Sequence, residues 1–141
     1  MSYLCTPYLY LSQMNRKDYE IMAPVGSYES LMAAINAGAD SIYFGIEGLN
    51  MRSKSANNFT TEDLHKIAAI CREHDVKSYL TVNTIIYDED LALMREIIDS
   101  AKAADVSAII AADVAPMLYA RSIGVEVHLS TQLNITNVEA L

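Results

Sequence analysis

A strand, a tight turn and a helix start follow one another within ten residues near the beginning of the chain. Residues 21–25 (IMAPV) are apolar, Pro24 and Gly26 indicate a turn, and Ser27 is a residue type that caps helices. A buried strand that passes straight into a helix is the unit from which parallel sheets are built. The N–H groups of the first helical turn then lie beside the C-terminal end of the strand, where they favour an anion or a polar substrate. We therefore look for functional residues at the strand ends.

The same strand-to-helix unit recurs along the chain. Apolar runs at 41–46, 77–83, 107–112 and 125–130 predict further strands, and the segments between them carry apolar residues at helical spacing. Strands that alternate with helices through short connections predict an α/β fold, with a parallel sheet covered by helices. The unit length suits an eight-unit (β/α) barrel of about 250 residues. No GxGxxG motif follows the first strand, so a barrel is favoured over an open doubly wound sheet.

About five parallel strands are fewer than the eight of a complete TIM barrel, so the sequence predicts a partial, TIM-like barrel. Residues 1–19 are interpreted as an N-terminal extension, and residues 20–141 as the N-terminal part of a barrel domain that is truncated at its C-terminus. The last strand would then have an unpaired edge. We predict self-association through this edge and marginal stability of the isolated chain.

Composition excludes several classes of protein. A hydrophobic fraction of 52% in 141 residues indicates a globular domain, and a formal net charge of −8 argues against a protein held to nucleic acid by its overall field, although a local basic patch stays open. Cys5 and Cys71 are too far apart for a disulfide framework or a metal knuckle, which favours a reducing compartment. No apolar run would span a bilayer, and the N-terminus lacks the features of a signal peptide. We expect a cytoplasmic protein with no membrane partner.

Polar side chains gather where the predicted strands end. In a barrel these ends form the face that carries catalytic groups. The set is rich in amides and hydroxyls and poor in acids, bases and thiols, so it predicts a hydrogen-bonding cradle for a polar ligand and leaves the catalytic residues unknown. The substrate-binding candidates are Arg52, Asn57, Asn58, Asn83, Asp113, Thr131, Gln132 and Asn134, and Ser27 lies at the same face.

Several candidates have two interpretations. Asn83 and Asn134 could contact a ligand or satisfy local backbone groups as turn residues. Arg52 with Lys54 could clamp a phosphate or a carboxylate, or could simply be solvated. Asp113 could be a base or a metal ligand, but a residue between strand and helix is as often a helix cap.

Cys71 and His128 are of residue types that are often catalytic, but each is assigned a non-catalytic role. Cys71 recurs at helical spacing with apolar residues and is interpreted as a core thiol. His128 lies inside a predicted strand and is interpreted as a hydrogen-bonded lining residue rather than a general base. No HExxH, GxSxG, P-loop or CxxC motif occurs. We therefore predict no metal site and no cofactor in this chain.

Five ordered motifs resemble one known family. The sequence is similar to the N-terminal half of the U32 peptidase family, also called the collagenase-like protease family, from about Glu20 to Leu141. The motifs are residues 23–31 (APVGSYESL), 37–45 (AGADSIYFG), 55–60 (SANNFT), 79–84 (YLTVNT) and 130–137 (STQLNITN). Together they make the resemblance specific, whereas any one alone would not.

The resemblance implies more than one activity. The family was labelled as proteases, yet it includes enzymes that hydroxylate pyrimidines in tRNA or rRNA, and relatives that hydroxylate a quinone precursor. Those members carry an iron–sulfur cluster on four cysteines beyond the matching segment, and neither Cys5 nor Cys71 sits at a matching position. The leading hypothesis is an RNA-hydroxylating enzyme, in which the full-length protein binds RNA. A peptidase and a non-catalytic fragment are the alternatives, and we expect the isolated chain to be inactive.

Overall fold

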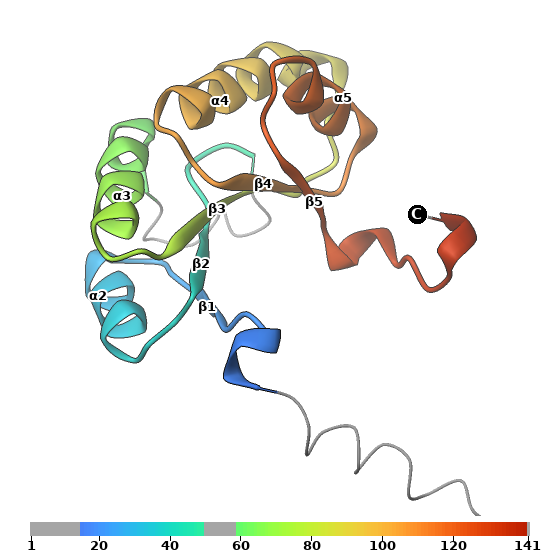
Figure 1. Ribbon diagram of the computed structural model, residues 1–141. Coiled ribbons are helices and arrows are strands. Elements are labelled where there is room, and N and C mark those ends of the chain that lie inside the picture. Colours follow the sequence, from blue (N-terminus) through green and yellow to red (C-terminus); the bar gives the residue numbers. More distant parts are fainter. Residues whose placement is uncertain (1–14, 50–58, 141) are drawn as a thin grey trace, which may run out of the picture.

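The computed structural model describes residues 15–49 and 59–140, which form one curved sheet with helices on its outer side (Figure 1). The strands are β1 (Met22–Pro24), β2 (Ser41–Phe44), β3 (Lys77–Val82), β4 (Ala108–Ala111) and β5 (Val127–Leu129). They are parallel and lie in the order β1-β2-β3-β4-β5. The predicted α/β class is confirmed, and the curved parallel sheet is consistent with a partial TIM-like barrel.

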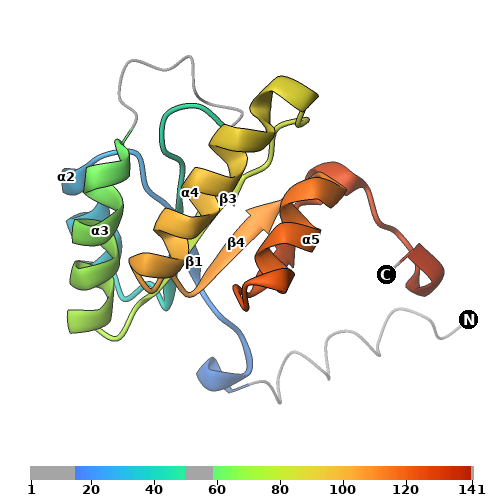
Figure 2. The ribbon, with the colours of Figure 1, turned by 90° about the horizontal axis from the view of Figure 1, so that it is seen from above.

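The α-helices of the described residues connect the strands and cover the convex side of the sheet, as Figures 1 and 2 show. They are α2 (Tyr28–Asn36), α3 (Thr61–Glu73), α4 (Leu91–Ala103) and α5 (Val114–Ser122). Short 3-10 turns complete the described elements: η1 (Arg16–Asp18), η2 (Asp88–Asp90), η3 (Thr131–Leu133) and η4 (Val138–Ala140). None of the helices in the described residues is long and apolar enough to cross a membrane.

Residues alternate between the two faces of the sheet because successive side chains of a strand point in opposite directions. Phe44, Leu80 and Ile109 stand side by side in the register, are buried, and belong to the core beneath the helices. The intervening residues, such as Tyr79 and Thr81, face the concave side. Cys71 is buried in the helix-side core, which confirms the prediction of a core thiol.

Local signals place most element boundaries, with two differences from the sequence prediction. Thr60 followed three positions later by Asp63 predicts a capping box with Asp in place of Glu, and Thr60 does cap α3, because its hydroxyl accepts a hydrogen bond from the Asp63 amide. The sequence predicts a helix capped by Asp88, but α4 begins two residues later than that, because residues 88–90 form the 3-10 turn η2 and Asp90 becomes the N-cap of α4. The strand predicted over 41–46 ends at Phe44, and Ile46 instead forms an isolated bridge with Phe59.

The turn η1 belongs to the segment interpreted as an N-terminal extension, yet it contacts the sheet. Arg16 forms an ion pair of 2.8 Å with Asp40, which lies just before β2. The same Asp40 carboxylate accepts a hydrogen bond of 2.6 Å from the Ile21 amide. Asp40 therefore fixes the entry of the chain into β1. At the other border of the sheet, β5 pairs only with β4 among the described strands, and this is the edge through which we predict self-association.

Candidate functional site at the C-terminal strand ends

The loop after β2 carries three candidates, Arg52, Asn57 and Asn58, that lie outside the described residues. The described residues on either side of it are held together. The Glu47 amide donates a hydrogen bond of 3.0 Å to the Phe59 carbonyl. Phe59 is buried and packs edge-on against Tyr28 at 5.5 Å between ring centroids. The loop therefore starts and ends at the C-terminal edge of β2.

Tyr28 connects Phe59 to the start of α3. Its hydroxyl donates a hydrogen bond of 2.7 Å to the Asp63 carboxylate. Burial, followed by the hydrogen bond to Asp63, raises the pKa of Tyr28 to about 12. Tyr28 thus stays protonated as a donor at neutral pH and links the first turns of α2 and α3.

Asp113 acts as a helix cap, one of its two predicted interpretations. One carboxylate oxygen accepts a hydrogen bond of 2.9 Å from the Ala115 amide, in the first turn of α5. The other accepts a hydrogen bond of 3.3 Å from the Ile86 amide in the connection after β3. The side chain therefore ties two neighbouring strand ends together. Asn83, at the end of β3, is half-buried on the same border of the sheet.

The candidates after β5 lie in a tight exposed turn. The buried Ser130 hydroxyl accepts a hydrogen bond of 3.3 Å from the Gln132 amide. Asn134 adopts a left-handed conformation with φ of 52° and donates from Nδ2 to the Gln132 carbonyl at 3.1 Å. Asn tolerates this conformation better than most residues. Asn134 thus has the turn role that was one of its two interpretations, while the side chains of Thr131 and Gln132 remain exposed.

Ser27 is also used locally. Its hydroxyl accepts a hydrogen bond of 3.2 Å from the Ser30 amide as the N-cap of α2. Two of the polar residues at the strand ends, Ser27 and Asp113, are therefore caps. Asn83, Thr131 and Gln132 stay predicted members of a hydrogen-bonding cradle.

A second polar cluster lies on the concave face and was not predicted. The Lys77 ammonium is 2.6 Å from one Glu20 oxygen, and the Tyr79 hydroxyl donates to the other at 2.7 Å. The hydrogen bond from Lys77, assisted by the Ser41 and Tyr79 hydroxyls, lowers the pKa of Glu20 to about 2 against opposing burial. Burial and Glu20 raise the pKa of Tyr79 to about 12. The i, i+2 spacing of Lys77 and Tyr79 signals one face of a strand, but nothing local points to Glu20.

The Glu20 cluster predicts a loss of stability in acid. The pKa of Glu20 is about 2 in the folded chain, against its ordinary value of 4.5, which applies to the unfolded chain. Its contribution is therefore complete above about pH 4.5 and disappears as the pH falls towards 2. The carboxylate is about one-third exposed, so we expect Glu20→Gln to cost at most about 1 kcal/mol at pH 7. Urea unfolding of both proteins at pH 7 and pH 3 should show the difference shrinking in acid, and an equal difference at both pH values would contradict this account.

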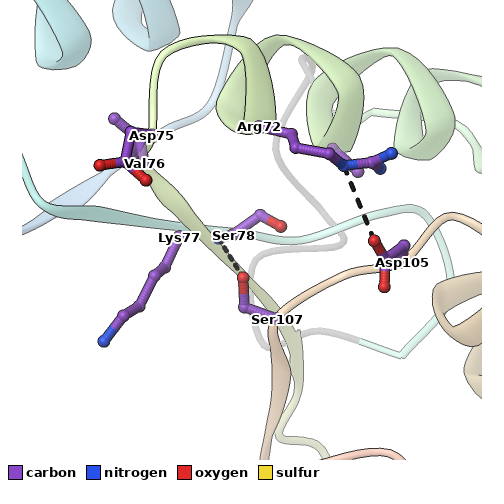
Figure 3. A pocket seen from close by; sticks show the side chains of 8 residues that line it. Arg72, Asp75, Val76, Lys77, Ser78, Asp105 and Ser107 are labelled. Atoms are coloured by element: carbon purple, nitrogen blue, oxygen red, sulfur yellow. Dashed lines mark hydrogen bonds and ion pairs between the residues drawn. The ribbon is translucent and has the colours of Figure 1, made fainter.

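A shallow pocket of about 270 Å³ lies at the opposite end of the sheet (Figure 3). There Arg72 and Asp105 form an ion pair of 3.7 Å, and the Ser107 hydroxyl accepts a hydrogen bond of 3.1 Å from the Ser78 amide. Arg72 and Asp105 are largely exposed as well as paired. Because the pocket adjoins the N-terminal ends of β3 and β4, it is separate from the candidate site.

The described residues offer little for redox or nucleophilic chemistry. No group of three or more His, Cys, Asp or Glu side chains in the described parts is arranged to hold a metal ion. Burial raises the pKa of the Cys71 thiol to about 11, so the thiol stays protonated at neutral pH, as befits a core residue. The described part of the chain therefore does not provide the four thiolates of an iron–sulfur cluster, and Cys5 lies outside it.

The fold defines an α/β protein of the partial-barrel type, with polar side chains at the C-terminal border of its sheet. The sequence profile described as Peptidase family U32 matches residues 26–141, which is more than half of the chain. The chain therefore belongs to peptidase family U32.

Curated relatives carry two kinds of name. The chain is 78% identical over 128 residues to "Collagenase" of Porphyromonas gingivalis, covering 91% of this chain and 31% of the relative. It is 32% identical to "tRNA hydroxylation protein P1" of Bacillus subtilis, covering 89% and 30%. It is 28% identical to "23S rRNA 5-hydroxycytidine C2501 synthase" of Escherichia coli, covering 85% and 18%. The chain spans less than a third of the length of these relatives.

Proposed function

We propose that the full-length protein containing this segment hydroxylates pyrimidines in tRNA or rRNA. The observation that carries the proposal is that relatives named for tRNA hydroxylation and for 5-hydroxycytidine in rRNA align over nearly the whole chain. The amide and hydroxyl side chains at the ends of β3 and β5 suit hydrogen bonding to a base or a ribose. This chain would supply part of the substrate cradle, and RNA would bind through the full-length protein in the cytoplasm.

The chemistry of hydroxylation must come from elsewhere in the full-length protein. The resemblance implies an iron–sulfur cluster on four cysteines beyond the matching segment. The described residues do not provide these four cysteines. Such a cluster would supply electron transfer. The 141-residue chain by itself is then expected to bind weakly and to turn nothing over.

The peptidase remains the second candidate because of the 78% identity to a protein named "Collagenase". A peptidase needs an activated nucleophile or a metal-bound water. Among the described residues the buried Cys71 does not meet that requirement. A peptidase would therefore also depend on groups outside the described part of the chain. A non-catalytic fragment is the third candidate, and a stop codon directly after Leu141 in the native gene would favour it.

The experiment is mass spectrometry of nucleosides from total RNA of the source organism with the intact gene and with the gene deleted. We expect a hydroxylated uridine or cytidine to disappear on deletion and to return on complementation. Purified full-length protein is assayed in parallel on gelatin and collagen, with and without class-specific protease inhibitors. An unchanged nucleoside profile together with inhibitor-sensitive cleavage would replace the hydroxylase with the peptidase.

A further inference from the structure

The concave face of the sheet is more polar than the interior of a typical barrel. Branched apolar side chains usually fill such an interior. Here Lys77 and Tyr79 of β3 share the face with His128 of β5, and Glu126 lies two residues before His128 on the same side of the strand. The register supports this placement, because His128 pairs with Ile110, which in turn pairs with Thr81.

His128 is held in a defined orientation. Its ring packs edge-on against Tyr79, with 4.7 Å between ring centroids. Its Nε2 lies 3.1 Å from the Glu126 carboxylate. In the neutral ring this contact places the proton on Nε2, an assignment that follows from the hydrogen bond, so Nδ1 carries the lone pair. A ring fixed by a carboxylate and an aromatic edge is pre-organised to accept a hydrogen bond at Nδ1.

Three of the other polar side chains on this face are already committed to partners. Lys77 and the Tyr79 hydroxyl are both bound to Glu20. The Thr81 hydroxyl donates a hydrogen bond of 3.0 Å to the Phe44 carbonyl. Nδ1 of His128, by contrast, has no partner among the described residues. The His128 side chain is 36% exposed, and it lies two residues before Ser130, close to the end of β5 where the cradle begins.

We infer that His128 is a substrate-contacting residue whose Nδ1 accepts a hydrogen bond from an N–H group of the target pyrimidine. This inference rests on the proposed function and deepens it. Cytidine offers its N4 amino group and uridine its N3–H, so the same acceptor serves either base. Glu126 acts as the positioning residue, because it sets which ring nitrogen is free.

The test uses the full-length gene, expressed at a limiting level in the deletion strain, with the hydroxylated nucleoside quantified relative to protein abundance. In His128→Asn the side-chain amide occupies the region of Nδ1, whereas in His128→Gln it occupies that of Nε2. We expect His128→Gln to lower hydroxylation at least tenfold and His128→Asn to retain several times more than His128→Gln. The matched control is His65→Gln on the exposed face of α3, which should behave as wild type.

The outcomes separate the two proposals. If gene deletion leaves the nucleosides unchanged, the proposed function fails, and the role of His128 fails with it. If deletion removes the modification but His128→Gln retains it, only the role of His128 is overturned. Equal losses in both His128 variants, accompanied by lower protein abundance, would assign His128 a purely structural role and would also overturn the inference.

Discussion

Replacing Leu80 with alanine is expected to destabilise the chain by about 3 kcal/mol, because a leucine buried in a central strand loses both its transfer free energy and its packing. Leu80 is fully buried in β3 and lies between Phe44 of β2 and Ile109 of β4 in the register. Domains of this kind have total stabilities of about 5–15 kcal/mol. The substitution should therefore remove a large share of the stability of a sheet with open edges.

Urea unfolding of the 141-residue chain, followed by circular dichroism, measures this effect. With a slope of about 2 kcal/mol per molar urea, the midpoint should fall by about 1.5 M. Leu118→Ala is the matched control, because Leu118 is 62% exposed on α5 and alanine is an equally good helix former. A Leu80→Ala midpoint no lower than that of Leu118→Ala would show that the sheet is not packed against its helices as described.

Two substitutions of Asp113 are expected to separate its contribution to stability from a role in catalysis. Asp113→Ala removes the cap of α5 and leaves the Ile86 amide without its partner, which should together cost about 2 kcal/mol. Asp113→Asn keeps a good cap and loses only the second contact, at a cost of about 1 kcal/mol. At about 3 °C per kcal/mol, thermal unfolding should show decreases of about 6 and 3 °C.

The same pair of variants in the full-length protein tests the alternative role. If Asp113 is a cap, Asp113→Asn should retain most of the nucleoside modification despite its lower melting temperature. If Asp113 is a general base or a metal ligand, the neutral amide would abolish the activity while the protein stays folded. Loss of activity at unchanged abundance would therefore return Asp113 to the catalytic candidates.

Local patterns in the sequence were sufficient for the elements and for most caps. The apolar runs located all the strands of the described sheet, because strands of a parallel sheet are continuous in hydrophobicity. The prediction that the first strand is buried was wrong, because β1 lies at a border of the described sheet and has exposed residues, as β5 does at the other border. Thr60 with Asp63 marked the start of α3, and the helical spacing around Cys71 placed that thiol in the core. The start of α4 was missed by two residues, because a 3-10 turn and a first α-helical turn share the same acidic residues.

The candidate site was likewise predictable from the sequence only in part. The residue types at the strand ends were sufficient to list the candidate residues, but not to decide which of them act as helix caps or turn residues. The second hydrogen bond of Asp113 reaches 27 positions back to Ile86, and no short-range motif encodes it. The sequence pattern was equally compatible with a cap and with a base or metal ligand, and the hydrogen bond from the Ala115 amide shows the cap.

By itself the sequence determined what depends on neighbours within about one helical turn: the strand and helix order, the caps at Ser27 and Thr60, and the burial of Cys71. Only the tertiary structure decided which side chains contact one another on the concave face. Glu20 bonds to Tyr79 across 59 positions, and Tyr79 packs on His128 across a further 49. The reason is geometric, because these side chains come together only when several parallel strands align in register and the sheet curves towards its open face.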